Sequence, residues 1–441
     1  MHLHSLPAAM FVSAGLLVTT AQAAEVQVLT TSDPKLNMAP LTLPGGRIAN
    51  YTIGIGSGAF RHPSDPADII WTVGDRGPNM TCAESVKLLG EDIAARCRKL
   101  PSGRVYPTPG YTPSIYKVQL DRKAGTFAVL ETIPVRKSKS GALVTGLLNP
   151  QTAATRDTAM NLAGATLPYD SDNIDLEAIV RLSDGSFWIA EEMGPSIAHV
   201  SANGRLLKRL VPANAAADYK DAEAEIVPSL PAILSKRQGN RGFESLAISP
   251  DERFLYTIMQ NPLANPDAKA FRQARNSRIF KIERESGKII GQYVYQLDDP
   301  RSFGADPSQD QSDPRISELM ALGPDRLLVL ERTEKTTKLH EIVLDGATNI
   351  LGTKWDDLAT SPSLEALNDL GPLAITPVRK TLRFDTFRDF KDAPEKIEGM
   401  ALLGDGSLAL INDNDFGIRG DTTKILIVKG TVTADPAAYR R

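Results

Sequence analysis

The sequence contains few cysteines and few histidines, and these shortages exclude several classes of enzyme. The chain has 2 Cys and 5 His among 441 residues. After the first residues only His62, His199 and His340 remain, and none is spaced as a zinc-binding pair. Neither cysteine is followed by Arg as in a cysteine-phosphatase loop, and no Gly-x-Ser-x-Gly motif is present. Zinc hydrolases, cysteine phosphatases and α/β-hydrolases are therefore excluded.

The chain also lacks an excess of one charge and a long hydrophobic run. Its formal net charge is −3, and Lys and Arg are scattered along the sequence, so no basic surface for nucleic acid is predicted. Apart from the N-terminus, no segment is apolar enough to cross a bilayer. We expect a monomer without a stable membrane anchor or a nucleic-acid partner, acting on a small molecule.

The N-terminus has the features of a secretory signal peptide over residues 1–23. An apolar run at residues 8–18 is followed by Ala21-Gln22-Ala23, the small-x-small pattern of a cleavage site. The run is shorter than the roughly 20 residues that a membrane span needs. We predict cleavage near Ala23, a mature single domain of residues 24–441, and a periplasmic or secreted location.

Export affects the interpretation of the two cysteines, Cys82 and Cys97, which lie close together in one insertion. In an oxidising compartment such a pair is expected to form a disulfide. Two free thiols in a loop are the alternative. Metal binding is not predicted, because the segment lacks the usual ligand spacing.

Residues 172–210 contain four short strand patterns in a row. An apolar segment at 178–182 ends in Asp184-Gly185, a dipeptide typical of tight hairpins, and Phe187 to Ile189 favour a strand. Two further segments, at 196–200 and 205–210, are separated by a turn at Asn203-Gly204. Four antiparallel strands joined by short turns are typical of one β-propeller blade.

The first half of this pattern recurs along the chain. A Glu introduces the first strand in four copies, and a fainter copy without Glu occupies residues 56–73. The four are Glu177, Glu244, Glu318 and Glu398, at steps of 67, 74 and 80 residues. We predict an all-β fold, a β-propeller of four-stranded blades with five visible units and space for a sixth between Gly58 and Glu177. The last unit lacks a clear fourth strand, so residues 26–29 are expected to complete it and close the ring.

The recurring glutamates predict a charged site at one end of the propeller axis. Each precedes the innermost strand of its unit, and like charges gathered there require cations nearby. Glu177 follows an oxygen-rich run, residues 172–175, which suits Ca²⁺. The predicted calcium ligands are Asp175, Glu177, Glu244, Glu318 and Glu398. The alternative is an Arg–Glu network that only locks neighbouring blades together.

The second strand of each unit ends in polar residues on the same side. Asp and Asn favour turns, which explains Asn414 and Asp415 but not Glu191, Glu192 or Arg332. We therefore place candidate catalytic groups at these ends and at neighbouring positions: Arg76, Glu191, Glu192, Arg332, Lys396 and Asp413. The candidate substrate-binding cations are Arg76, Arg241, Arg332 and Lys396.

Several motifs together resemble those of the bacterial phytase-like propeller family, over about residues 45–429. These motifs are Asp175-Leu-Glu177-Ala-Ile, Trp188-Ile-Ala-Glu-Glu192, Gly242-Phe-Glu244-Ser-Leu, Ile397-Glu398-Gly-Met and Gly420-Asp421-Thr-Thr-Lys-Ile. Members are described as having esterase-like activity of phytase. True β-propeller phytases are six-bladed calcium enzymes, so the five visible units depart from that pattern.

Three functions are consistent with these features. The first is a calcium-dependent phosphoester hydrolase, in which Arg76, Arg332 and Lys396 offset charge in the transition state. The second is a calcium-dependent lactonase or carboxylesterase. The third is a non-catalytic periplasmic binding protein, because fold alone does not define a reaction.

Overall fold

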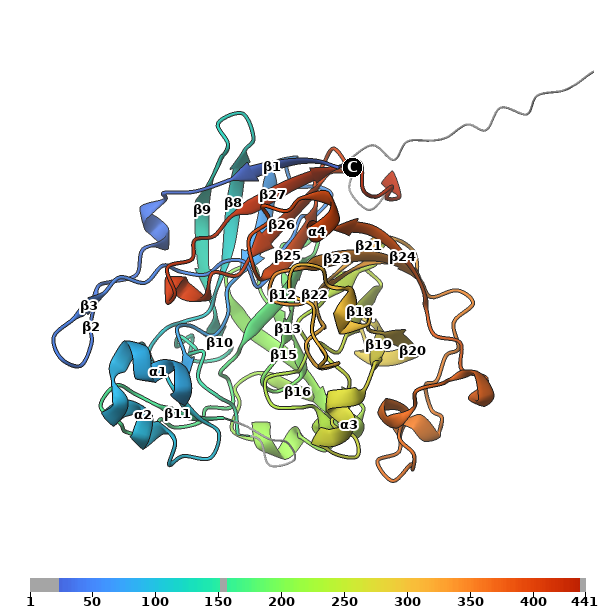
Figure 1. The fold of residues 1–441 in the computed structure, drawn as a ribbon, viewed down its shortest axis with the longest axis horizontal. Coiled ribbons are helices and arrows are strands. Elements are labelled where there is room, and N and C mark those ends of the chain that lie inside the picture. Colours follow the sequence, from blue (N-terminus) through green and yellow to red (C-terminus); the bar gives the residue numbers. More distant parts are fainter. Residues whose placement is uncertain (1–23, 151–156, 437–441) are drawn as a thin grey trace, which may run out of the picture.

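The computed structural model describes residues 24–150 and 157–436, and its core consists of five antiparallel sheets (Figure 1). The predicted signal peptide, residues 1–23, lies outside the described residues. Among the described residues, no helix is long and apolar enough to cross a membrane. The all-β prediction is confirmed, since helices are few and short.

The five sheets follow one another along the chain. The first contains β4 (Gly58–Phe60), β5 (Ile69–Val73), β8 (Ser114–Asp121) and β9 (Thr126–Pro134). The second contains β12 (Leu176–Arg181), β13 (Phe187–Glu191), β14 (Ser196–Val200) and β15 (Arg205–Pro212). Two further strands, β10 (Arg136–Lys137) and β16 (Glu225–Leu230), both pair with β15. The third contains β17 (Ala247–Ile248), β18 (Phe254–Ile258), β19 (Asn276–Glu283) and β20 (Lys288–Gln296).

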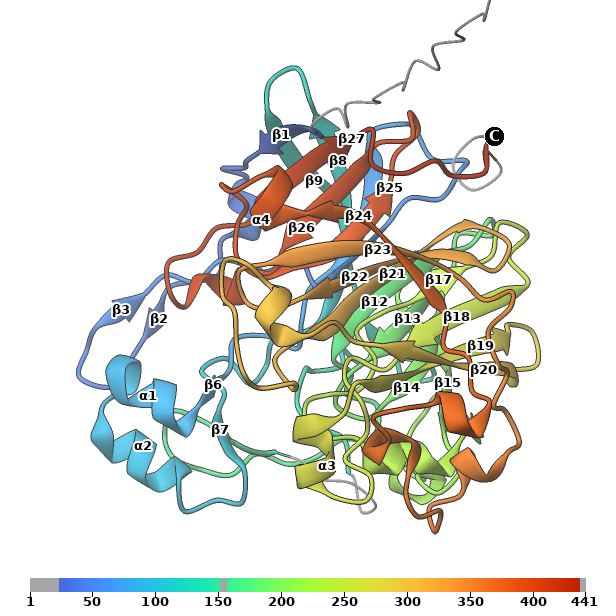
Figure 2. The ribbon, with the colours of Figure 1, turned by 45° about the vertical axis from the view of Figure 1, so that its right-hand side comes forward.

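The fourth and fifth sheets complete the series. The fourth contains β21 (Arg315–Gly323), β22 (Arg326–Arg332), β23 (Thr337–Val343) and β24 (Arg379–Asp385). The fifth contains β25 (Ile397–Leu402), β26 (Leu408–Asn412), β27 (Ile425–Lys429) and β1 (Glu25–Leu29). The first and last strands of the described chain therefore share a sheet, as Figure 2 shows.

The pairing of β1 with β27 confirms the prediction for residues 26–29. The two strands are antiparallel, in a register that runs from Glu25 opposite Lys429 to Leu29 opposite Ile425. Leu29 is fully buried. This pairing covers an edge of β27 that would otherwise present unpaired N–H and C=O groups.

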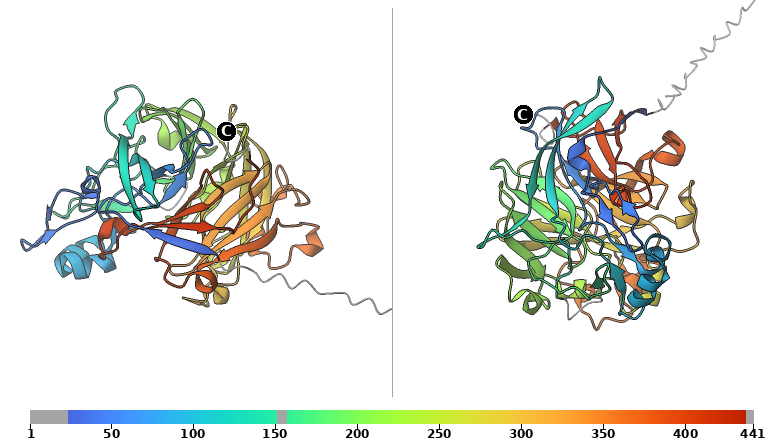
Figure 3. Two further views of the ribbon diagram at one scale, coloured as in Figure 1. Left: turned by 90° about the horizontal axis from the view of Figure 1, so that it is seen from above. Right: turned by 90° about the vertical axis from the view of Figure 1, so that its left-hand side faces the viewer.

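Apolar side chains fill the space between each pair of neighbouring sheets. Strand β13 is buried along its whole length, because its sheet packs on neighbours through both faces. An apolar cluster also joins the last sheet to the first, since Ile411 and Ile427 of the fifth sheet pack with Ile70 and Val118 of the first. The first strands of the sheets touch in the order β4, β12, β17, β21, β25 and back to β4. Figure 3 shows the blue N-terminal strand beside the red C-terminal strands.

Glycines allow the first strands to approach one another this closely. A Cβ on Gly58 would lie 2.7 Å from Ala178 Cα, and one on Gly56 would lie 2.1 Å from the carbonyl oxygen of Asn412. Gly54, Gly56 and Gly58 therefore allow close packing between the first, second and fifth sheets.

The interval between Gly58 and Glu177 holds no sixth four-stranded sheet within its described residues. It contains the rest of the first sheet, a small sheet, and the helices α1 (Cys82–Leu89) and α2 (Glu91–Cys97). The small sheet is formed by β6 (Met80–Thr81), β7 (Gly103–Val105) and β11 (Thr158–Met160). The predicted Cys82–Cys97 disulfide is present and joins the start of α1 to the end of α2.

The remaining short elements belong to the connecting segments. A hairpin of β2 (Leu41–Thr42) and β3 (Ile48–Ala49) projects beside α1 (Figure 1). Helix α3 (Ala268–Gln273) precedes β19, and α4 (Thr386–Asp389) follows β24. The long segment between β23 and β24 reaches back to the third sheet, where Glu365 accepts a hydrogen bond from the buried Arg278 at 2.8 Å.

We predict that deletion of residues 25–29 lowers the melting temperature and promotes aggregation, because it exposes the edge of β27 and removes Leu29 from the core. Burial of one leucine side chain contributes about 2 kcal/mol. Calorimetry and size-exclusion chromatography measure both effects. Val28→Thr is the control, since Val28 is 37% exposed and the change keeps the strand. A deletion variant as stable and monodisperse as the control would contradict the prediction.

Candidate functional site

A cavity of about 120 Å³ lies where the five sheets meet, at the ends from which their first strands begin. Every side chain that lines it is charged or carries an amide. The lining acids are Asp75, Glu177, Glu192, Glu244, Glu398, Asp413 and Asp415. The cations are Arg76, Arg104, Arg241, Arg315, Arg332 and Lys396, and the amides are Asn79 and Asn240. All five sheets contribute to this set, so the cavity exists only in the folded chain.

A β-bulge determines which residue of the first strand faces this cavity in the second and fifth sheets. In the second sheet Leu176 pairs with Glu191 and Ala178 with Ala190, which leaves Glu177 as the extra, unpaired residue. In the fifth sheet the same shift leaves Glu398 unpaired. A bulge re-aims the side chain of the extra residue. Both glutamates line the cavity as a result.

The prediction that all four repeated glutamates share one cavity is wrong for Glu318. In the fourth sheet the bulge falls one residue earlier, on Ser317, and Glu318 pairs regularly with Leu330. Its carboxylate is fully buried and accepts backbone N–H groups of Leu319 at 2.9 Å, Ala59 at 3.2 Å and Leu246 at 3.4 Å. Glu318 thus joins the fourth sheet to segments of the first and third.

Two other predicted residues lie behind the lining. Glu191 is fully buried, and its carboxylate accepts the N–H of Gly194 at 2.8 Å and the hydroxyl of Ser196 at 3.1 Å. Its neighbour Glu192 lines the cavity instead, because successive side chains of a strand point in opposite directions. Asp175 is also buried, and it accepts the backbone N–H of Arg76 at 3.1 Å.

One cluster of carboxylates at the site comes from the first and second sheets. One carboxylate oxygen each from Asp75, Asp175 and Glu177 lie within 4.8 Å of one another. Asp175 Oδ2 is buried and accepts no hydrogen bond from the described residues. Burial, together with the neighbouring carboxylates, raises the pKa of Asp75 and of Glu177 well above its usual range. Arg76 Nη1 lies 3.6 Å from Asp175 Oδ2 and supplies one positive charge. Three clustered carboxylates exceed that single charge, so the group fits a hard divalent cation such as Ca²⁺.

Three guanidinium groups from the third and fourth sheets also line the cavity, those of Arg241, Arg315 and Arg332. Burial and the charges of Arg332 and Arg241 lower the pKa of Arg315 to about 10. Arg332 forms an ion pair with Glu398 and donates from Nε to Ser317 Oγ at 3.0 Å. Guanidinium groups held this close repel one another, and an anion between them would relieve the repulsion.

Lys396 is already neutralised by carboxylates of its own sheet. Its ammonium lies 2.7 Å from Asp413 Oδ2 and also contacts Asp415. Burial would raise the pKa of Asp413, but the Lys396 charge and hydrogen bonds hold it below its ordinary value. Lys396 and Asp413 therefore form an ion pair in the wall of the cavity, and their catalytic role stays a prediction.

Sequence reasoning did not assign several lining residues to the site. Asp75 follows the strand pattern that ends at residue 73 but was not predicted to be a ligand. Asp415 was assigned to a turn. Arg104 comes from β7 of the small sheet, far from any repeat, so no sequence pattern marked it. Asn240 accepts a hydrogen bond from Arg76 Nη2 at 2.6 Å, which only the packing of two sheets creates.

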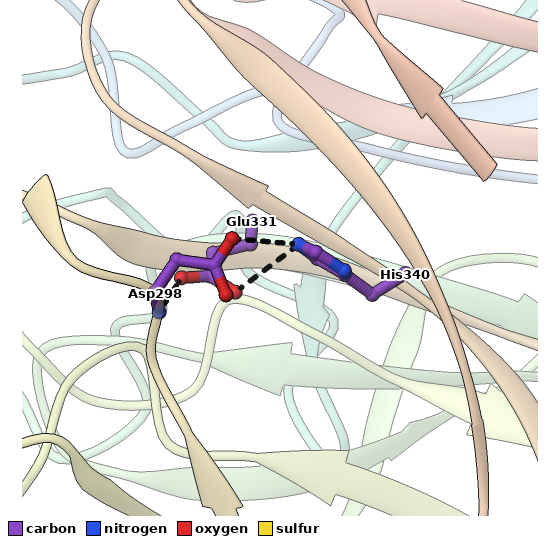
Figure 4. A group of neighbouring side chains, drawn as sticks. All are labelled: Asp298, Glu331 and His340. Carbon is purple, nitrogen blue, oxygen red and sulfur yellow. Dashed lines mark hydrogen bonds and ion pairs between the residues drawn. The ribbon is translucent and has the colours of Figure 1, made fainter. Parts of the chain in front are cut away.

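A second group of side chains also has metal-ligand composition. Asp298, Glu331 and His340 lie together between the third and fourth sheets (Figure 4). However, Lys380 Nζ lies 2.7 Å from both carboxylates, and Lys338 Nζ lies 3.0 Å from Asp298. Two ammonium groups balance two carboxylates, so a divalent cation would add uncompensated charge. This cluster is best described as a brace between the two sheets.

The fold and site define an all-β protein whose sheets converge on one charged cavity. A family model described as phytase-like, esterase-like activity of phytase, matches residues 106–416. The chain belongs to this family. The matched span includes the repeated glutamates and the Asp413–Asp415 segment but not Asp75 or Arg76.

Sequence and structure comparisons find a partial sequence match and solved structures of low similarity. An uncharacterized secreted protein from Arthroderma benhamiae is 29% identical over 177 residues, which cover 36% of this chain and 34% of the relative. The Malassezia sympodialis allergen Mala s 1 is 10% identical with a TM-score of 0.34, covering 89% of this chain and 86% of the allergen. The calcium-binding protein regucalcin from Agrobacterium tumefaciens is 11% identical with a TM-score of 0.32, covering 89% and 98%. TM-scores this low support no argument about fold or function.

The carboxylates of the cavity predict a pH dependence of stability in the presence of a chelator. Burial and the Glu192 carboxylate raise the pKa of Glu244 to about 7 from its ordinary value of 4.5. Arg332, a hydrogen bond from Ser317 and Arg315 oppose this rise. The folded protein therefore holds a proton at Glu244 that the unfolded chain releases, and this stabilisation is present below about pH 4.5 and is lost as the pH rises through about 7.

Glu244→Gln mimics the protonated side chain. We expect the variant and the wild type to melt together at pH 5, and the variant to melt higher at pH 8. Calorimetry between pH 5 and pH 8 with chelator measures the difference. Glu177 and Glu398 also act on Glu244, so the variant removes only part of the wild-type slope. A variant that is equally or less stable at pH 8 would contradict the assignment.

Proposed function

We propose that this chain is an exported, calcium-dependent phosphoester hydrolase built on a five-bladed β-propeller. Support for the propeller comes from the cyclic contacts of the first strands and from the apolar cluster that joins the fifth sheet to the first. Support for export comes from the Cys82–Cys97 disulfide and the secreted relative. The family description supports ester hydrolysis.

One observation carries the proposal: the carboxylates of Asp75, Asp175 and Glu177 and the guanidinium groups of Arg241, Arg315 and Arg332 meet at a single cavity. Asp75, Asp175 and Glu177 would hold the calcium ion. A cation bound there would supply positive charge that polarises an ester oxygen and favours attack by water. Arg241, Arg315 and Arg332 would hold the phosphoryl oxygens, since guanidinium groups bind phosphate through several N–H donors at once.

The remaining lining residues supply proton transfer and orientation. Glu244 lines the cavity and would donate a proton to the leaving oxygen. Glu192, buried and beside Arg241 at 3.9 Å, is the second candidate for this role. Arg76 positions Asp175 through its backbone N–H at 3.1 Å. Each assignment requires the cavity to bind one anionic ester group.

A panel of phosphomonoesters, carboxylic esters and lactones, each with calcium and with chelator, tests the proposal. We expect hydrolysis of phosphomonoesters that falls about 10²-fold on chelation. Glu177→Gln should lose the calcium dependence and most of the activity. Activity that ignores chelator would overturn the calcium assignment, and activity confined to carboxylic esters or lactones would overturn the phosphoester assignment.

Glu318→Gln is the matched control, because Glu318 occupies the corresponding sequence position of another repeat but does not line the cavity. Gln at this position cannot accept all three backbone N–H groups, so stability should fall by about 1–3 kcal/mol. Calcium-dependent activity per folded molecule should remain. Equal loss of activity in both variants would indicate that Glu177 acts only through the fold.

A further inference from the structure

A second, larger cavity adjoins the charged one. Its volume is about 790 Å³, and the two cavities share Asn79, Arg104 and Asp415 in their linings. The outer cavity lies between α1 and the segment that follows β26. Figure 1 shows the α1–α2 insertion at the periphery of the molecule. The two cavities are therefore neighbours that meet at these three side chains.

The linings of the two cavities differ in chemistry. The charged cavity has no apolar side chain in its lining, whereas the outer cavity has Met80, Ala83, Leu88 and Ile418. Leu88 and Ile418 also pack against the buried cluster of the insertion, which includes Met80. This apolar wall is thus backed by a core, and the Cys82–Cys97 disulfide ties that core together.

The charges of the outer cavity are mostly engaged with other groups. Glu84 forms an ion pair with Arg419 at 2.5 Å, which links α1 to the segment across the cavity. Arg104 donates to Asn79 Oδ1 and lies 4.0 Å from Asp157. Asp415 is bound by Lys396. Of the cations in this lining, Lys87 is the one for which no such pair is found among the described residues.

We propose that the outer cavity binds the uncharged organic part of a substrate whose anionic group lies in the charged cavity. This inference rests on the proposed ester hydrolysis and specifies its substrate class: a monoester with one phosphoryl group on an alkyl or aryl body. A polyanion such as a highly phosphorylated sugar would place several charges against Leu88 and Ile418, where Lys87 offers only one charge to offset their desolvation. Leu88, Ile418 and Ala83 are the residues that determine specificity.

Binding of alkylphosphonates from methyl to hexyl, measured by calorimetry with calcium, tests the proposal without requiring turnover. For the wild type we expect affinity to rise about two- to fourfold for each methylene that enters the outer cavity. Leu88→Ser and Ile418→Ser should flatten this rise and leave methylphosphonate binding unchanged. Ala83→Trp fills the cavity from an exposed position on α1 and should weaken hexylphosphonate selectively, even where the serine variants fold poorly.

Val86→Ser is the matched control, since Val86 lies on α1 with 37% exposure and does not line the cavity. It should keep the wild-type rise. Methylphosphonate binding without any dependence on chain length would overturn this inference alone. A chain-length dependence that survives all three cavity variants would also overturn it. Failure of every phosphonate to bind would overturn the proposed function, and this inference with it.

Discussion

The structure depends on the close approach of five first strands at their common meeting point. This approach requires residues without side chains at the tightest contacts, as Gly56 and Gly58 show. It also brings the polar ends of five sheets into one small volume. Charged side chains near the start of these strands face this volume, with the exception of Glu318, so a charged cavity follows from the packing of the sheets.

Gathering so many ionisable groups in a buried volume is costly unless opposite charges offset one another. The protein meets this requirement in two ways. Some pairs are close, such as Lys396 with Asp413. Others are wider, such as Arg241 with Glu192 at 3.9 Å, Arg315 with Glu334 at 3.7 Å and Arg76 with Asp175 at 3.6 Å. We assign function to the groups of the wider pairs, where an external ion can take the place of a partner.

The same residue types also serve structure elsewhere in the molecule. The Asp298–Glu331–His340 cluster has the composition of a metal site, yet Lys380 and Lys338 balance its carboxylates. Glu318 carries the sequence signature of the repeated glutamates, yet it binds backbone N–H groups of three segments. Composition alone therefore does not distinguish a ligand site from a brace, and the identity of the neighbouring donors does.

The sequence by itself determined the strand repeats, the completion of the fifth sheet by residues 26–29, the Cys82–Cys97 pair and the end of the sheets where charge collects. These features follow from local patterns and from spacing along the chain. The tertiary structure decided which of the repeated glutamates face the cavity. In the fourth sheet the bulge is displaced by one residue, so Ser317 rather than Glu318 is the extra residue. It also decided the contributions of Asp75 and Arg104, whose partners lie on other segments. A one-residue shift reverses the direction of a strand side chain, and no local pattern in this sequence reports that shift.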